Sequence, residues 1–249
     1  MKLFQRIFFA AVLSGLAAGL AMSAVQQWRV VPLILEAENY ESGAADHTHE
    51  PGTPAHSHAG ELPDGHVHDA DAWAPQDGVE RTFYTVLANT LGGIGFAFLL
   101  VAVSVLAGLP ITARNGIIWG IGGFAAFQLA PAIGLPPELP GMAAAELGIR
   151  QAWWLGTALA TGAGLIVLAK LRNWTGLGMA AVLVLAPHVI GAPAAPDDAS
   201  VVPAHLATSF AANALATGAL FWLLAGPLLG WLNERFARPV VATATEARA

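Results

Sequence analysis

The 249-residue sequence contains no cysteine. This absence excludes disulfides, thiolate zinc sites, iron–sulfur clusters and cysteine nucleophiles, so any metal must be held by imidazole, carboxylate, carbonyl or thioether groups. Charged residues are also scarce, at 11% of the chain, whereas ordinary soluble domains carry about 25%. Because 55% of the residues are hydrophobic, too few polar side chains remain to cover a soluble domain of this size. The composition indicates an integral membrane protein.

Lys and Arg residues are few, and they are not spaced to form a basic stripe on the surface. The chain has 11 Lys and Arg against 17 Asp and Glu, and residues 36–80 hold eleven of those acids with no Lys or Arg. Nucleic-acid binding is therefore excluded, because no basic surface is available to neutralise phosphates. The sequence also lacks a P-loop, a GxGxxG motif and a convincing Ser/His/Asp arrangement. We therefore expect no enzymatic activity.

Six apolar runs are candidates for membrane-spanning helices, which need about 20 residues each. They cover residues 7–27, 82–109, 116–133, 152–169, 177–191 and 206–231. The fifth run approaches the required length only when it is extended back to Trp174. The expected fold is an all-α, polytopic membrane bundle of about six transmembrane helices, forming one integral membrane domain over residues 1–249. A cleaved signal peptide is an alternative for the first run, whose length favours an uncleaved helix.

The positions of Lys and Arg predict the orientation. If the N-terminus is cytoplasmic, six spans place eight of the 11 bases in the cytoplasm and three outside, as the positive-inside rule requires. We therefore expect a multi-pass protein in the lipid bilayer of the bacterial inner (cell) membrane, with both termini cytoplasmic. The acidic window is then extracytoplasmic.

The segment 42–79 is rich in His and Asp and is expected to be a flexible extracytoplasmic loop, because it has too few apolar residues to form a core. It carries three H-x-H pairs, namely His47 and His49, His56 and His58, and His66 and His68. In an extended chain the two imidazoles of such a pair point to one side and can reach one ion. Imidazole suits Zn, Cu, Ni and related divalent ions. The pattern predicts a loop that collects metal ions, and a solvated spacer with incidental histidines is the alternative.

Carboxylates stand directly after the first span. Glu36, Glu38 and Glu41 follow Pro32 and lie at the extracytoplasmic mouth of any pathway. Glu38 and Glu41 are three residues apart on a helix, so they can share one ion. The alternatives are a charged, solvated helix end or neutralisation by arginines, for which Arg81 and Arg150 are candidates.

His188 is the histidine most deeply placed within an apolar run. It follows Pro187 in P-H-V-I-G-A-P, and a proline inside a helix leaves a backbone carbonyl of the preceding turn free. An imidazole beside such carbonyls could hold an ion. A hydrogen bond to a neighbouring helix is the alternative.

Other polar and small residues in the spans have structural interpretations. Asn89, Gln128 and Asn213 are expected to form interhelical hydrogen bonds, and the Gly15/Gly19 and Gly116/Gly120 spacings permit close helix packing. Residues 130–142 contain four prolines and two glycines. This segment is expected not to be regular helix.

Several sequence blocks resemble the predicted cobalt transporter subunit family CbtA. They are E-A-E-N-Y-E (36–41) with the H-x-H loop beside it, F-Q-L-A-P-A-I-G-L-P-P-E-L-P-G-M (127–142), R-Q-A-W-W (150–154) and A-P-H-V-I-G-A-P (186–193). The resemblance implies a membrane protein for cobalt uptake linked to cobalamin synthesis. It also implies a partner, the small single-span subunit CbtB, which carries histidines of its own. Cobalt is identified by this resemblance alone.

The hypothesis is that Co²⁺ is a transported substrate and that no cofactor is bound permanently. The His pairs would collect the ion, Glu36, Glu38 and Glu41 would receive it, and it would cross past His188. Transport or export of nickel or zinc is one alternative. A metal-binding membrane receptor or scaffold that transports nothing is another. Metal selectivity, energy source, assembly into homo-oligomers and the need for CbtB are left open by the sequence.

Overall fold

The computed structural model describes residues 3–46, 75–196 and 200–237. In these ranges the chain is helical without strands, and its elements are α1 (Leu3–Arg29), α2 (Val31–Asp46), α3 (Val79–Ala107), α4 (Gly116–Phe124), the π-helical turn η1 (Ala125–Leu129), α5 (Ala130–Gly134), α6 (Leu147–Lys170), α7 (Trp174–Ile190) and α8 (Ala204–Ala237). The elements α4, η1 and α5 follow one another without a break and form one span.

The predicted all-α polytopic bundle is confirmed. Five helices of the described chain are long and apolar enough to cross a membrane, and α7 is a sixth, shorter apolar helix of 17 residues. All six apolar runs of the sequence thus become helices. The start of α7 at Trp174 follows from its N-cap, because the Asn173 side chain accepts a hydrogen bond from the Gly176 N–H at 2.8 Å and satisfies one of the free donors of the first turn.

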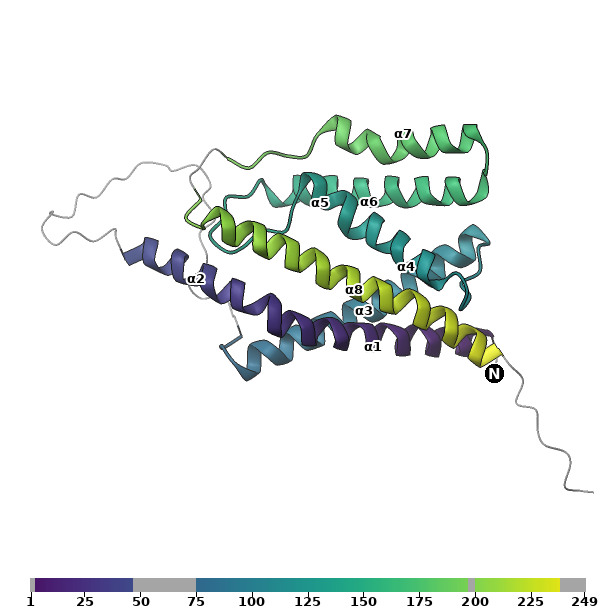
Figure 1. Ribbon diagram of the computed structural model, residues 1–249, viewed down its shortest axis with the longest axis horizontal. Coiled ribbons are helices and arrows are strands. Elements are labelled where there is room, and N and C mark those ends of the chain that lie inside the picture. Colours follow the sequence, from purple (N-terminus) through teal and green to yellow (C-terminus); the bar gives the residue numbers. More distant parts are fainter. Residues whose placement is uncertain (1–2, 47–74, 197–199, 238–249) are drawn as a thin grey trace, which may run out of the picture.

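Successive spans alternate in direction, so the start of α1 and the end of α8 lie at the same end of the bundle (Figure 1). We call this the basic end; its charged residues in the described chain are Arg6, Arg114, Lys170, Arg172, Glu234 and Arg235. At the opposite, acidic end α2 extends beyond α1. The charged residues there are Arg29, Glu36, Glu38, Glu41, Asp46, Asp77, Glu80, Arg81, Glu138, Glu146 and Arg150.

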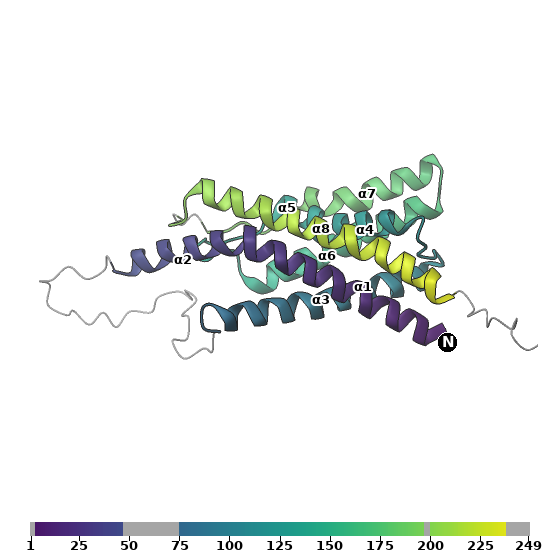
Figure 2. The same cartoon turned by 60° about the horizontal axis from the view of Figure 1, so that its bottom comes forward.

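Helix α8 is the element around which the bundle packs, since it contacts α1 and α4 extensively (Figure 2). Glycines allow this closeness: a Cβ atom on Gly120 would overlap the carbonyl oxygen of Trp222, and one on Gly226 would overlap that of Gly116. On the other side of the bundle, α1 approaches α3 in the same way through Gly15 and Gly19. The predicted close packing at both glycine pairs is confirmed.

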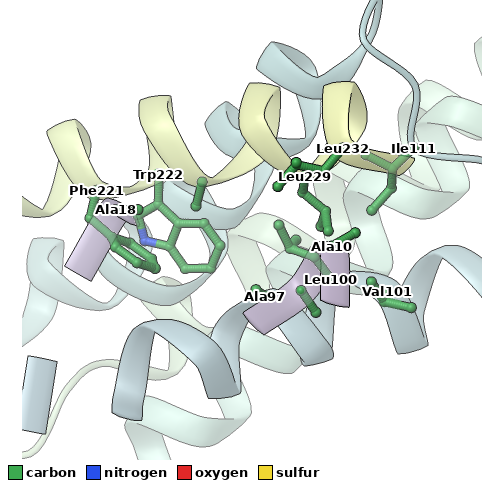
Figure 3. Packing of buried hydrophobic residues seen from close by; sticks show 12 residues of the cluster. Ala10, Ala18, Ala97, Leu100, Val101, Ile111, Phe221, Trp222, Leu229 and Leu232 are labelled. Carbon is green, nitrogen blue, oxygen red and sulfur yellow. The ribbon is translucent and has the colours of Figure 1, made fainter. Parts of the chain in front are cut away.

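The buried core lies between α8, α1 and α3. Large side chains of α8, including Phe221, Trp222 and Leu229, pack against alanines of α1 and against Leu100 of α3 (Figure 3). Trp222 is the largest of the fully buried side chains in the described chain, with 1% of its surface exposed. Small residues on α1 and bulky ones on α8 thus interlock at short interhelical distance.

Helices α6 and α7 form a hairpin outside this core. They pack mainly on each other, and α6 reaches the rest of the bundle largely through η1 and α5. The outer face of α7 is strongly exposed, with Trp174 at 87% and Val189 at 84%. Such an apolar face is what a lipid-facing helix presents.

The expectation for residues 130–142 needs correction. Residues 130–134 are helical, as α5, and only the stretch from Leu135 to Glu146 is irregular. Pro131 directly follows the π turn η1, where the regular ladder of hydrogen bonds is already interrupted, so its missing N–H is tolerated inside the span. The later prolines do exclude helix, as expected.

The glycine contact between α4 and α8 leads to a stability prediction. Gly226→Ala should destabilise the protein by roughly 1–3 kcal/mol, because its Cβ would force the two backbones apart. Gly178→Ala on α7 is the matched control, since its Cβ would meet no atom within 4 Å. Thermal unfolding of the purified protein in detergent checks this, and equal midpoints for the two variants would contradict the packing argument.

Candidate functional site

A bidentate ion pair joins α2 to α3 at the acidic end. Nη1 and Nη2 of Arg81 donate to the two carboxylate oxygens of Glu38, at 3.2 and 2.9 Å. The Nε atom of Arg81 also lies 3.3 Å from Asp77. Both partners of the main pair are about two-thirds buried. Neutralisation by Arg81, the alternative considered for these carboxylates, is thus what the structure shows for Glu38.

The remaining candidates near Glu38 are less constrained. Glu36 is exposed on α2, and none of the described residues forms an ion pair with it. Glu41 belongs to the same helix, but its side chain is outside the described residues. The six predicted histidine ligands also lie outside them: His47, His49, His56, His58, His66 and His68. Where side chains are described, no group of three or more His, Asp or Glu residues could hold a metal ion.

His188 lies at the junction of α7 with α6. Its ring meets the indole of Trp153 edge-on, with 6.0 Å between centroids. The Trp153 Nε1–H donates to the carbonyl oxygen of Pro187 at 3.3 Å. The Nε2 atom of His188 is buried and has no hydrogen-bond partner in the described chain. The imidazole is therefore held by packing, and one of its nitrogens is unengaged.

The irregular segment after α5 is held in place by two carboxylates. Glu138 accepts a hydrogen bond from Nη2 of Arg150 at 2.5 Å. Glu146 caps α6, since its side chain accepts from the N–H groups of Gly148 and Ile149 at 2.7 and 3.0 Å. These contacts fix the segment against the start of α6.

An open cavity of about 670 Å³ lies in the acidic half of the bundle, between α1, η1, α5, α6 and α8. Its polar lining comprises the Glu138–Arg150 pair and three carboxamides, from α1, η1 and α6. The lining residues are Gln26, Phe127, Gln128, Pro131, Ala132, Leu135, Pro136, Pro137, Glu138, Leu147, Arg150, Gln151, Trp154, Leu155, Ala214 and Leu215. We call it the acidic-end cavity. It is roomy, and its lining is mostly apolar with a few polar groups, as ligand sites usually are.

The π turn η1 positions one of these carboxamides. The Ala130 N–H bonds to the carbonyl oxygen of Ala125, five residues back, and this wider turn directs Gln128 toward α8. The Gln128 amide lies directly on Gly218, where a Cβ atom would overlap it. Its Oε1 atom is buried and has no partner among the described residues. π turns are rare and occur often at functional sites.

Two of the three polar residues that were expected to form interhelical hydrogen bonds do form them. Asn89 donates to Ser23 and Gln26 of α1, at 3.0 and 2.6 Å, and Asn213 accepts from Arg29 at 3.2 Å. These two predictions are confirmed. The prediction is wrong for Gln128, whose carbonyl oxygen has no hydrogen-bond partner among the described residues.

Aromatic rings close the acidic-end cavity toward the middle of the bundle. Phe127, which lines the cavity, stacks on Trp222 with 5.8 Å between centroids and an interplanar angle of 11°. Phe96 meets both rings edge-on, at 5.3 and 5.2 Å. We call Phe96, Phe127 and Trp222 the aromatic floor of the cavity, and their rings pack closely on one another.

A second cavity, of about 410 Å³, lies at the basic end and is lined by residues that include Arg6, Asn233 and Glu234. Along α8, Leu215 of the first cavity and Asn233 of the second are about 27 Å apart at 1.5 Å per residue. Trp222 stands between them. The bundle therefore has a cavity at each end and an aromatic layer between the two.

Sequence reasoning missed the acidic-end cavity and the position of Gln128 in it. The available signal was a carboxamide three residues before a proline inside an apolar run. Such a proline perturbs the preceding turn, which is where a side chain can be redirected.

The chain matches one family model, described as "Probable cobalt transporter subunit (CbtA)", over residues 4–234. No curated protein and no solved structure matches it. The matched range covers the six apolar helices, except for the first residue of α1 and the last three of α8, and nearly all of the described chain. This chain therefore belongs to the CbtA family of probable cobalt transporter subunits.

Proposed function

We propose that the chain is the membrane subunit of a cobalt uptake transporter linked to cobalamin synthesis, and that it acts together with a small CbtB-like membrane subunit. It would lie in the bacterial inner membrane with its basic end, and so both termini, in the cytoplasm. The charge difference between the two ends supports this orientation, because basic residues favour the cytoplasmic side.

The observation that carries the proposal is the acidic-end cavity. It reaches into the bundle from the end where described carboxylates outnumber arginines, so a divalent cation is attracted toward its entrance. A protein that only bound metal at its surface would not need a cavity with amide and charged groups within the spans.

In the proposed sequence of steps, the histidine pairs of residues 42–79 collect Co²⁺ and pass it to Glu36, Glu38 and Glu41. Arg81 occupies both oxygens of Glu38, so an ion that binds Glu38 must displace this guanidinium. The exchange would keep the carboxylate neutralised at every stage. From there the ion enters the acidic-end cavity.

The driving force that we propose is the membrane potential. Two positive charges that move to a negative interior gain roughly 4.6 kcal/mol per 100 mV. The sequence has no nucleotide-binding motif, so ATP hydrolysis would have to be supplied by another chain.

Two other functions fit the same metal ligands. A nickel or zinc transporter would use identical histidines, since imidazole binds all of these ions. A metal-binding receptor or scaffold would use the histidines but not the cavity.

Metal flux into liposomes tests the proposal. The purified chain is reconstituted with and without the CbtB-like subunit, and the entry of Co²⁺, Ni²⁺ and Zn²⁺ is measured under an inside-negative potential. We expect Co²⁺ entry that rises with the potential, because two charges move with each ion. Flux of nickel or zinc in place of cobalt would identify a different substrate, and an absence of flux for all three metals would favour a receptor.

His188 gives a second prediction, based on its unengaged Nε2 atom. His188→Phe keeps an aromatic ring against Trp153 but removes the nitrogen, so Co²⁺ flux should fall about tenfold or more even at high metal. Trp153→Phe is the control, because it alters the same contact and leaves the imidazole in place. Normal flux in His188→Phe would assign His188 to packing.

A further inference from the structure

A buried acceptor without a donor marks one position in the wall of the acidic-end cavity. Oε1 of Gln128 is buried, and none of the described residues donates a hydrogen bond to it. Leaving such an acceptor unpaired is destabilising, because its hydrogen bond to water is lost on burial and not replaced. The π turn that carries Gln128 is a further departure from regular helix. Both the unpaired acceptor and the π turn are explained if the Gln128 amide contacts a bound ligand.

The polar groups around this position are neutral. Gln26 and Gln151 line the same cavity, and Gln26 is oriented by the hydrogen bond from Asn89 at 2.6 Å. The charged lining residues of the described chain are Glu138 and Arg150, which neutralise each other. Amide oxygens, without a free carboxylate, are therefore what the cavity offers to a cation.

We propose that the acidic-end cavity binds a divalent cation that keeps most of its water shell. The Gln128 amide, whose oxygen is buried in the structure, rotates about its terminal bond to present that oxygen as the main protein contact, and the amides of Gln26 and Gln151 bond to the shell. This inference rests on the proposed function and specifies how the ion is held. Six waters occupy about 180 Å³ at roughly 30 Å³ each, well within a cavity of about 670 Å³.

Neutral amides suit a transient site. A conducted ion must bind well enough to enter and weakly enough to leave. A free carboxylate would hold Co²⁺ more strongly through its full negative charge. The ligand class is thus a hydrated divalent cation, recognised by oxygen dipoles.

Gly218 determines where the Gln128 amide lies. A Cβ atom at this position would overlap the amide oxygen, nitrogen and carbon. Gly218→Ala therefore displaces the amide without replacing any polar group of the cavity. Gly162→Ala is the matched control on α6, since its Cβ would meet no atom within 4 Å.

Glutamine side-chain NMR tests the site by binding alone. The full chain, with the six histidines of residues 47–68 replaced by asparagine, is labelled with ¹⁵N-glutamine and titrated with Co²⁺. Because Co²⁺ is paramagnetic, it should broaden the amide signals of Gln26, Gln128 and Gln151 together and saturably. Gln5, at the basic end, should be unaffected. Broadening of Gln5 to the same degree, or of no cavity amide, would overturn the proposal.

Three variants and one control variant are titrated with Co²⁺ in the same way. Gln128→Leu and Gly218→Ala should raise the half-saturating Co²⁺ concentration about tenfold, and Gln128→Glu should lower it about tenfold by adding a charge. Gly162→Ala should leave it unchanged. Identical titrations for all four would overturn the site.

The flux measurement and the NMR titration distinguish the cation site from the transport function. Co²⁺ flux into liposomes without any effect on the cavity amides would overturn the site and leave the transport function standing. Saturable broadening of the cavity amides without flux would support the site and contradict transport.

Discussion

The backbone contact between α4 and α8 is the constraint on which the rest of the arrangement depends. Helices in lipid gain little from the hydrophobic effect when they associate, so close van der Waals packing must hold them together. Gly116, Gly120 and Gly226 provide it, because none of them has a Cβ atom to separate the backbones. The same approach brings Trp222 onto Gly123 and the Gln128 amide onto Gly218. The aromatic floor and the wall of the acidic-end cavity are both consequences of this contact.

Charge and polarity are distributed in a way that suits cation passage. In the described chain, carboxylates outnumber arginines at the acidic end, whereas bases dominate the basic end. Between the ends, the acidic-end cavity offers carboxamides and one internally neutralised ion pair. In the transport that we propose, a cation would be attracted to the entrance and would meet no unpaired charge among the described lining residues. The aromatic floor of Phe96, Phe127 and Trp222 then separates this cavity from the one at the basic end.

Much of the fold could be predicted from the sequence, because membrane helices are marked by long apolar runs and their ends by polar caps such as Asn173. The Glu38–Arg81 pair was anticipated as an alternative, since both residues flank spans that meet at one end. The site could not be predicted in the same way. The environment of Gln128 depends on a local π turn and on Gly218, ninety residues away, and neither leaves a periodic signal. The metal-binding roles of Glu36, His188 and the histidine pairs stay predictions.

The absence of cysteine allows the central claim, that cations enter through the acidic-end cavity, to be tested directly. Ala214 lines this cavity, so Ala214→Cys provides a single thiol there, and Val79→Cys provides one on an 87% exposed position at the same end. Each variant is treated with a membrane-impermeant thiol reagent, and Co²⁺ uptake is then measured. Modification at position 214 should abolish uptake and be slowed by Co²⁺, whereas modification at position 79 should do neither. Full modification at position 214 with normal uptake would contradict the account.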